Sequence, residues 1–498
     1  MYNSSDSSLV DARLVVAGIS LGFFGDIRRK SMKRQEEAIR DAKVLGIPNM
    51  VLLGLQHMFA MFGATILVPA LTGLSVSATL LFAGLGTLLF HLVSKRKVPA
   101  FLGSSFAFLG GYFAVEGWAK SAGITDSASL LPYACLGVAC AGALYLIMAA
   151  LIKAFGTNRV MRFFPPVVTG PIIIAIGLCL ASSAVNSCET NWLIAAVAIA
   201  IVVVCNIFGK GMVKIIPIML GVIGSTLLAV ILHLTGAAQI FEPEGLEVLN
   251  NAAWIGLPFR MKDTVFSIFG NNFDPGLLIT AIITIAPISF ATIVEHIGDI
   301  SAISSTTGQN YIEDPGLNRT LLGDGLATIL ASLFGAPANT TYGENTGVLT
   351  ISRVYDPRVI RIAAAFAILF SFSPKFAALI GLMPTATIGG ISLILYGMIS
   401  AVGVRNLVET QTDFTKSRNV VITALIIGLA VGINYSASGA LNITIGSVTI
   451  GFTGLAVGAL VGILLNAVLP DKEWQFREKI KNVHKMNIKE NKDERNSN

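Results

Sequence analysis

Charged residues are scarce in this sequence. They make up 13% of its 498 residues, whereas soluble globular domains carry roughly 25%. Hydrophobic residues make up 54%, and the mean hydropathy is +0.73. This composition excludes a soluble domain and predicts a polytopic membrane protein that contacts lipid. The net charge of +6 does not indicate a nucleic-acid partner, because the positive residues lie between hydrophobic segments.

The sequence also lacks the motifs of catalysis and of cofactor or metal binding. It contains no nucleophile elbow, no phosphate-binding loop and no cluster with metal-ligand spacing. No two cysteines form a CxxC pair, and we expect them to be small buried hydrophobic residues or, in the case of Cys188, part of a disulfide bridge. The cysteines are Cys135, Cys140, Cys179, Cys188 and Cys205. We therefore predict a protein that is not an enzyme and that has no cofactor and no metal.

Hydrophobic stretches of about 20 residues, the length that crosses a bilayer as a helix, recur along the chain. They predict an all-α protein with fourteen membrane segments. The segments lie at about 49–70, 77–93, 99–117, 129–153, 163–185, 190–208, 214–234, 275–303, 318–334, 337–352, 358–380, 384–403, 418–435 and 447–469. Two of them, 99–117 and 337–352, are weak as helices because proline, glycine and polar residues interrupt them.

The positive residues support this count and give the orientation. With the N-terminus inside, every Lys and Arg falls on the inner side except Lys120, Arg260, Lys262 and Lys375. Because the removal of one segment would scramble this alternation, the positive-inside rule favours an even number of segments. We predict a multi-pass protein of the plasma (inner) membrane, with both termini in the cytoplasm and a basic inner face beside anionic lipid.

The longest outer loop, at 235–274, divides the chain into two halves of seven segments, at 49–234 and 275–470. We expect residues 1–48 to form a basic cytoplasmic arm and residues 471–498 to form a cytoplasmic tail. Because seven is an odd number, the second half enters the membrane from the opposite side. This is the inverted-repeat arrangement of secondary transporters.

The third segment of each half is interrupted. VPAFLGSSFAFLGG at 98–111 and GAPANTTYGENTG at 335–347 both contain proline and glycine among polar residues. A matched pair of such segments marks the binding site of inverted-repeat transporters. We expect each segment to contribute an extended piece near the bilayer midplane, paired with the other. A half-helix with free N–H groups then follows in each segment.

Carboxyl groups inside these segments are the strongest candidates for a functional site, because an acid at membrane depth is costly. Glu295 and Asp299 lie one turn apart in the eighth segment, so both side chains project from one helix face. Either they face a cavity or share a proton, or Asp299 only caps the end of the segment. Glu344 opens the half-helix of the tenth segment and contacts a ligand or only stabilises the helix N-terminus. Gly343 would let a ligand approach the backbone closely.

Other titratable residues carry weaker signals. His57, next to Gln56 in the first segment, is either an interhelical hydrogen-bond partner or a group that contacts ligand or handles protons. His296 points about 100° away from Glu295, so we interpret it as structural. We interpret Asp324, in the ninth segment, as a packing or loop partner.

Two buried carboxylates beside backbone N–H and C=O groups suit a small, planar, neutral molecule with N–H donors next to C=O acceptors. An inorganic anion fits such a site poorly, because two acids repel it. A buried glutamate also suits coupling to protons, since burial favours its protonated form.

These residues resemble the nucleobase–cation symporter (nucleobase–ascorbate transporter) family, and within it the uracil permeases. The resemblance runs from about residue 48 to residue 470 and rests on long blocks of residues. The blocks are QHMFAMFGATILVP (56–69), PAFLGSSFAF (99–108), VEHIGD (294–299), DPGLNRTLLGDGLAT (314–328), NTTYGENTGVLTISRVY (339–355) and GGISLILYGMI (389–399).

The resemblance implies a core domain of segments one to four and eight to eleven, and a gate domain of segments five to seven and twelve to fourteen. It also implies short antiparallel strands in segments three and ten, with the nucleobase bound between them. The residues that it assigns to the nucleobase are Glu295, Glu344, Gly343, Phe106, Ala64, Tyr342 and Tyr396. Glu344 followed by Asn345 is similar to the uracil branch.

One residue departs from the family pattern. Where the characterised uracil permeases have a histidine one turn after the glutamate, this chain has Asp299, which could still exchange protons with Glu295. We expect a uracil importer driven by proton symport, with Glu295, Asp299 and His57 as the coupling residues and sodium as the alternative ion. The alternatives for function are a xanthine or other purine permease and, less favoured, an anion transporter or channel on a related fold. We also expect a homodimer.

Overall fold

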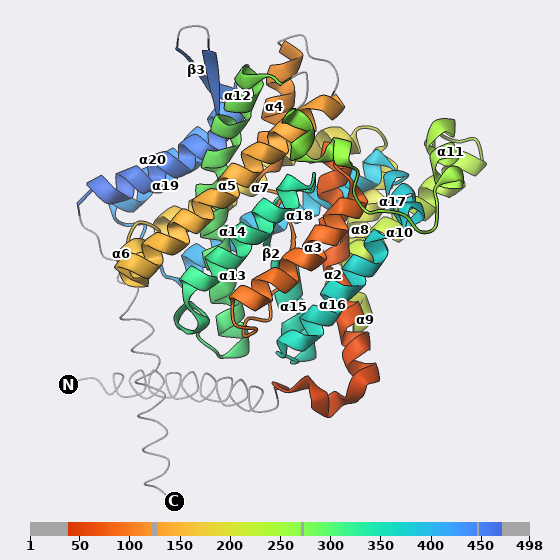
Figure 1. The fold of residues 1–498 in the computed structure, drawn as a ribbon, viewed down its shortest axis with the longest axis horizontal. Helices are drawn as coiled ribbons and strands as arrows, with labels where there is room; N and C mark the ends of the chain where they lie inside the picture. Colours follow the sequence, from red (N-terminus) through yellow and green to blue (C-terminus); the bar gives the residue numbers. More distant parts are fainter. Residues whose placement is uncertain (1–37, 122–126, 270–272, 446–447, 471–498) are drawn as a thin grey trace, which may run out of the picture.

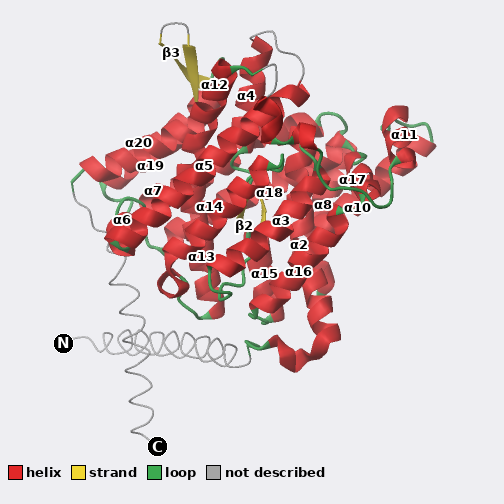
Figure 2. Cartoon of the chain, viewed as in Figure 1, coloured by secondary structure: helices red, strands yellow, loops and turns green. Residues whose placement is uncertain are grey.

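The structure is a computed structural model that describes residues 38–121, 127–269, 273–445 and 448–470. It is mostly helical, and its longer helices lie side by side in one bundle (Figures 1 and 2). In the described part of the chain, the strands form two separate two-stranded sheets. One sheet lies inside the bundle and the other projects from one end of it (Figure 2).

Eight helical stretches of the described residues are long and apolar enough to cross a membrane, and the structure is therefore that of a multi-pass membrane protein. They are α2 (Gly46–Thr72), α3 (Val76–Val93), α5 (Ser127–Phe155), α7 (Pro166–Cys188), α10 (Pro217–Leu234), the stack of α12 (Pro275–Ile285), η4 (Ala286–Ile288) and α13 (Ser289–Thr307), α18 (Thr385–Glu409) and α19 (Ser417–Asn434). The count of fourteen segments stays a prediction.

The remaining helices are shorter or less apolar. They are α4 (Leu109–Ser121), α6 (Thr157–Met161), α8 (Trp192–Phe208), α9 (Met212–Ile215), α11 (Pro243–Asn251), α14 (Leu317–Leu333), α15 (Gly343–Ser352), α16 (Pro357–Ser371), α17 (Pro374–Gly381) and α20 (Gly454–Val468), with short η1 (Ala42–Leu45), η2 (Met261–Asp263), η3 (Val265–Phe269) and η5 (Ile312–Gly316). The sequence predicts one straight segment at 358–380, whereas α16 and α17 meet at an angle of 87°. The bend follows from Ser373, whose side chain caps the new helix, and from Pro374 in its first turn.

Two antiparallel strand pairs complete the fold. β1 (Leu102–Ser104) pairs with β2 (Asn339–Thr341), and each strand lies in one of the two interrupted stretches. β3 (Ala440–Ile445) pairs with β4 (Val448–Thr453) in a hairpin that hydropathy does not predict. The predicted segment at 447–469 is therefore wrong over its first residues, which form a strand before α20 begins.

The helices pack in two groups. In one group α14 packs against α5 and α3, and α16 packs against α3 and α2. In the other group α18 packs against α7 and α8, while α19 packs against α20 and α7. β1 and β2 lie in the first group, where they contact α3, α14, α2 and α13.

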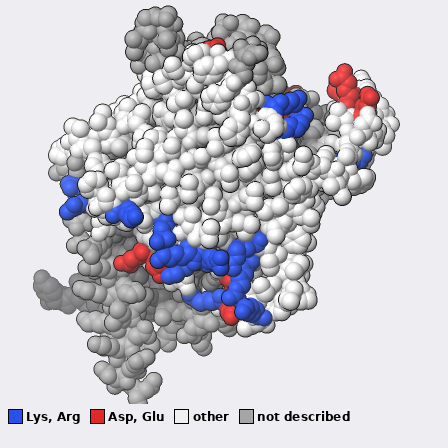
Figure 3. All heavy atoms as spheres, in the orientation of Figure 1, with Lys and Arg blue, Asp and Glu red and all other residues white. Residues whose placement is uncertain are grey.

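Charged side chains are absent from most of the face shown in Figure 3. They gather in a largely basic band along its lower edge and in a second, mixed patch at the upper right. Three basic residues are exposed in the turn after α3: Lys95, Arg96 and Lys97. Arg319, at the start of α14, is also exposed. The guanidinium of Arg319 donates to the Val93 carbonyl over 3.4 Å. A wide uncharged surface with charges at its edge is the distribution that a bilayer requires.

Candidate functional site

The β1–β2 pair brings the two interrupted stretches together. Leu102 lies opposite Thr341, and Ser104 lies opposite Asn339. The pairing continues beyond the strands, because Ser105 N donates to the Ala338 carbonyl over 2.8 Å and the N–H of the residue after Thr341 donates to the Phe101 carbonyl over 3.0 Å. All six strand residues are buried. Each stretch therefore satisfies the backbone groups that the other would leave without partners.

Side chains from neighbouring helices fix the two strands. Thr87 of α3 accepts from Leu102 N over 2.9 Å and donates to the Leu102 carbonyl over 3.2 Å. Asn339 donates its amide to the Phe82 carbonyl over 3.0 Å, and its own carbonyl accepts from the Thr328 hydroxyl over 2.9 Å. The strand pair is therefore held by α3 on one side and α14 on the other.

Tyr342 braces this strand pair. Its side chain is 3% exposed, and its hydroxyl donates to the Ser104 carbonyl over 2.9 Å. The ring lies so close to Gly103 that a Cβ at that position would sit 2.5 Å from two ring carbons and 2.8 Å from the Thr65 hydroxyl. The structure thus places the predicted pocket residue Tyr342 against the backbone of β1, where only glycine leaves room for it.

α15 begins directly after this tyrosine. Tyr342 is the N-cap residue, and its side chain makes no cap hydrogen bond to the first N–H groups of the helix. Gly343 is exposed, and a Cβ added to it would meet no atom within 4 Å. The backbone of Glu344 is in the first turn, but its side chain lies outside the described residues. The predicted half-helix therefore opens onto free space at Gly343.

The two acids of the eighth segment lie on α13. Glu295 and Asp299 are both half-buried. The Thr341 hydroxyl of β2 donates to Asp299 Oδ2 over 2.8 Å. Because α13 continues to Thr307, the alternative that Asp299 only caps the segment is wrong. Asp299 faces the strand pair instead.

His57 is a helix-to-helix contact. It is fully buried on α2, and the Asn345 amide nitrogen of α15 lies 3.2 Å from both its Nδ1 and its carbonyl oxygen. Of the two alternatives for His57, the interhelical hydrogen bond is the one observed, while its role with protons stays a prediction. The amide of Gln56 lies 2.7 Å from the Met212 sulfur. The sequence does not predict Asn345 as the partner of His57, because hydropathy does not indicate which residues of two helices face each other.

Two of the remaining candidate residues form an aromatic contact between the two helix groups. The rings of Phe106, after β1, and Tyr396, on α18, meet edge to face at 5.8 Å between centroids. Phe106 is 7% exposed and Tyr396 is 1% exposed. Ala64 on α2 is fully buried, and its carbonyl lies 3.5 Å from the Ser104 hydroxyl. The role of these three residues in a nucleobase site stays a prediction.

A buried pair lies on the other side of α13. His296 Nδ1 is 2.8 Å from Asp324 Oδ2 on α14, and both side chains are fully buried. The interpretation of His296 as structural and of Asp324 as a packing partner fits this contact. Their pairing could not be predicted, because it depends on how α13 packs against α14.

No disulfide joins the five cysteines, all of which lie in the described part of the chain, and the alternative of a bridge through Cys188 is wrong. Within the residues that the structure describes, no group of three or more His, Cys, Asp or Glu side chains is arranged to hold a metal ion.

Comparisons with known proteins agree with these features. The family model described as "Permease family" (Xan_ur_permease) matches residues 48–439. The uracil permease of Bacillus subtilis (strain 168) is 39% identical over 85% of this chain and 94% of its own length, and that of Bacillus caldolyticus is 38% identical over 87% and 94%.

Among solved structures, the transmembrane domain of a cyanobacterium bicarbonate transporter, BicA, is similar with a TM-score of 0.55 at 14% sequence identity. The match covers 86% of this chain and 99% of that domain. At this identity the similarity shows a shared fold and nothing more. The family match and the two bacterial relatives show that the chain belongs to this permease family.

Proposed function

We propose that this protein imports uracil by proton symport, with uracil bound where α15, α13 and the turn after β1 meet. The observation that carries the proposal is the β1–β2 pair, which brings the open N-terminus of α15 at Gly343 close to the acids of α13 through the Thr341–Asp299 hydrogen bond. The relatives named uracil permeases support the choice of substrate.

The chemistry of these groups matches a nucleobase of the uracil type. Uracil has two N–H donors and two C=O acceptors on a flat ring. Glu295 and Glu344 supply acceptors for the N–H groups, and the first N–H groups of α15 supply donors for a carbonyl. Phe106 supplies an aromatic surface beside Tyr396. A bicarbonate-type anion, in contrast, would meet two or three carboxyl groups.

Transport requires the site to be exposed to each side in turn, and the two helix groups supply the moving parts. The group around α2, α3, α5, α13, α14, α15 and α16 is the core, and the group around α7, α8, α10, α18, α19 and α20 is the gate. With the half-helices included, these elements correspond to fourteen segments in two inverted halves, with both termini in the cytoplasm of a plasma membrane protein. Two copies form a dimer.

Protons are taken up and released by Glu295 and Asp299. The Thr341 hydroxyl orients Asp299 beside the strand that carries the site. His57, tied to Asn345 on α15, couples the position of that half-helix to α2. Sodium is the alternative coupling ion.

Uptake of labelled uracil into cells that lack their own permease tests the proposal. We expect saturable uptake that a protonophore abolishes and sodium replacement does not, and that Glu344→Ala eliminates. Unlabelled uracil should compete, whereas xanthine should not. Competition by xanthine alone would indicate the purine permease, and uptake of no base would contradict the proposal. Bicarbonate exchange that persists in Glu295→Gln would indicate the anion transporter.

A further inference from the structure

Residues 38–45, which we name the N-terminal strap, run along the linker that follows α15. Ile39 N donates to the Arg353 carbonyl over 2.9 Å, and Tyr355 N donates to the Ile39 carbonyl over 2.9 Å. Ile39 and Val354 thus form a parallel β-bridge. Arg353 is the C-cap residue of α15, in the left-handed conformation with φ 54°. The strap is therefore attached at the end of α15 opposite to the proposed uracil site.

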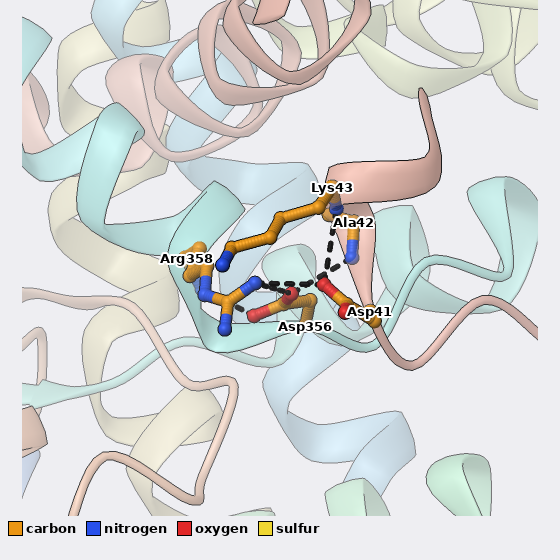
Figure 4. A network of polar contacts seen from close by, with 5 residues as sticks. All are labelled: Asp41, Ala42, Lys43, Asp356 and Arg358. Carbon is orange, nitrogen blue, oxygen red and sulfur yellow. Dashed lines mark hydrogen bonds and ion pairs between the residues drawn. The ribbon is translucent and has the colours of Figure 1, made fainter. Parts of the chain in front are cut away.

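A buried carboxylate strengthens this attachment (Figure 4). Asp356 is 5% exposed and accepts from Ala42 N over 2.8 Å with one oxygen and from Arg358 N over 2.9 Å with the other. The guanidinium of Arg358 in turn donates to Asp41 Oδ1 over 2.7 Å. The backbone N–H of Lys43 and then Arg358 hold the pKa of Asp41 below its usual value, so Asp41 is charged at neutral pH.

The strap also reaches α13. Arg40 donates to the Thr307 carbonyl over 2.9 Å. Thr307 is the last residue of α13, where carbonyl groups lack helical partners and the helix dipole favours a positive charge. One short segment therefore contacts the C-terminal ends of both helices that carry the proposed acids.

Apolar packing makes the strap part of the folded core rather than a surface arm. Ala42 is fully buried and packs in one cluster with Val354 and Val359. Ile39 and Leu45 pack against the same cluster. η1 then leads directly into α2, which carries His57 and Ala64. Release of the strap would expose this cluster and break five hydrogen bonds.

α15 needs such an anchor because it is short and poorly packed. Among its described residues, the buried ones are Asn345, Val348 and Leu349, whereas Gly347 and Thr350 are exposed. A helix of 10 residues is about 15 Å long and stiff, so a shift at its C-terminal end moves Gly343 at the other end.

We propose that the N-terminal strap is a positioning element of the uracil site: it travels with the core and holds α13 and α15 in the arrangement that binds uracil. This inference rests on the proposed function. It predicts that the strap stays attached throughout the transport cycle, and that a loosened strap lowers affinity because the binding-competent arrangement is populated less.

A cross-link tests whether the strap moves with the core. Bridge partners fall within the Cα separation of about 4.4–6.8 Å that a disulfide spans. In Ile39→Cys/Val354→Cys, oxidation should leave uracil uptake unchanged, with oxidised wild type as the control for the five native cysteines. Loss of uptake on oxidation, restored by a reductant, would show that the strap must detach and would overturn the proposal.

A loosened strap tests whether it positions the site. Arg40→Gln/Arg358→Gln removes two exposed or half-exposed anchors and should raise the KM for uracil roughly tenfold, equivalent to about 1.4 kcal/mol, with the maximal rate per molecule unchanged. Arg405→Gln, which removes an exposed charge from α18, is the matched control and should leave KM unchanged. If wild type takes up uracil normally and the double variant has an unchanged KM, the positioning role of the strap is wrong, while the proposed function stands. Absence of uptake in wild type contradicts the proposed function.

Discussion

The two interrupted segments share one backbone arrangement, but the glycine of each segment lies in a different environment. Both place a buried three-residue strand before a half-helix, and the strands pair with each other. In the first segment Gly103 is covered by the Tyr342 ring, and the flanking Phe101 and Phe106 are buried. In the second segment Gly343 borders free space.

The difference shows how a transporter keeps polar chemistry inside a membrane. The first segment supplies an apolar wall and a tightly filled support. The second supplies polar side chains, with Asn339 and Thr341 bonded to α3 and α13, and leaves one helix N-terminus open. We expect substitutions at Gly103, in the strand of the first segment, to lower stability. Substitutions at Gly343, at the helix N-terminus of the second segment, should weaken the binding of substrate.

The largest effect should come from the buried contact between α13 and α14, which lies next to the second segment. His296→Leu leaves the buried Asp324 without its partner and should cost about 3–5 kcal/mol of stability. Thermal unfolding of the purified protein in detergent measures the loss. The double variant His296→Leu/Asp324→Leu should recover much of it, since no buried polar group of the pair remains without its partner. Equal melting temperatures for wild type and His296→Leu would contradict this account of the pair.

The two glycines should differ most clearly. Gly103→Ala places a Cβ 2.5 Å from the Tyr342 ring and should cost about 1–3 kcal/mol of stability through overpacking. Gly343→Ala meets no atom within 4 Å and should leave the melting temperature unchanged while it raises the KM for uracil. If Gly343→Ala unfolds at the lower temperature of the two, the contrast between wall and open site is wrong.

The smallest of these effects concerns one hydroxyl on each strand. Thr341→Val removes the donor that orients Asp299, and uptake should fall up to about tenfold, because a net hydrogen-bond contribution of about 0.5–1.5 kcal/mol is lost. Ser104→Ala removes a donor to the Thr65 carbonyl and should change uptake little. Initial rates at equal surface amounts of protein measure both. The reverse order would place the proton-handling group near β1 rather than β2.

Much of the bundle could be predicted from hydropathy and charge placement, because lipid imposes long apolar runs with positive residues at one side. The interrupted stretches could also be predicted, since each combines proline and glycine with several polar residues within a few positions, which an uninterrupted lipid-facing helix does not contain. Hydropathy failed where apolar residues form other structures. ALNITI at 440–445 forms a strand, and its β-branched residues were the missed signal.

The individual acids could be found because buried charge is rare in a membrane, but their partners could not. Asp299 bonds to Thr341 and His296 contacts Asp324 only because α13 packs against both β2 and α14. The bend before α17 had a signal in Ser373–Pro374, the pair that begins a new helix. The attachment of Ile39 to Val354 joins residues too distant in the chain for any local pattern to indicate.

Protection of one cysteine tests most directly whether uracil occupies the open end of α15. Gly343→Cys and Gly381→Cys both place a side chain where no atom lies within 4 Å, the second at the end of α17 far along the chain. Both should react with a small methanethiosulfonate reagent above the wild-type background. Saturating uracil should slow the labelling of Gly343→Cys and leave that of Gly381→Cys unchanged. If uracil slows neither while wild-type uptake is saturated, the nucleobase binds elsewhere and the central claim is contradicted.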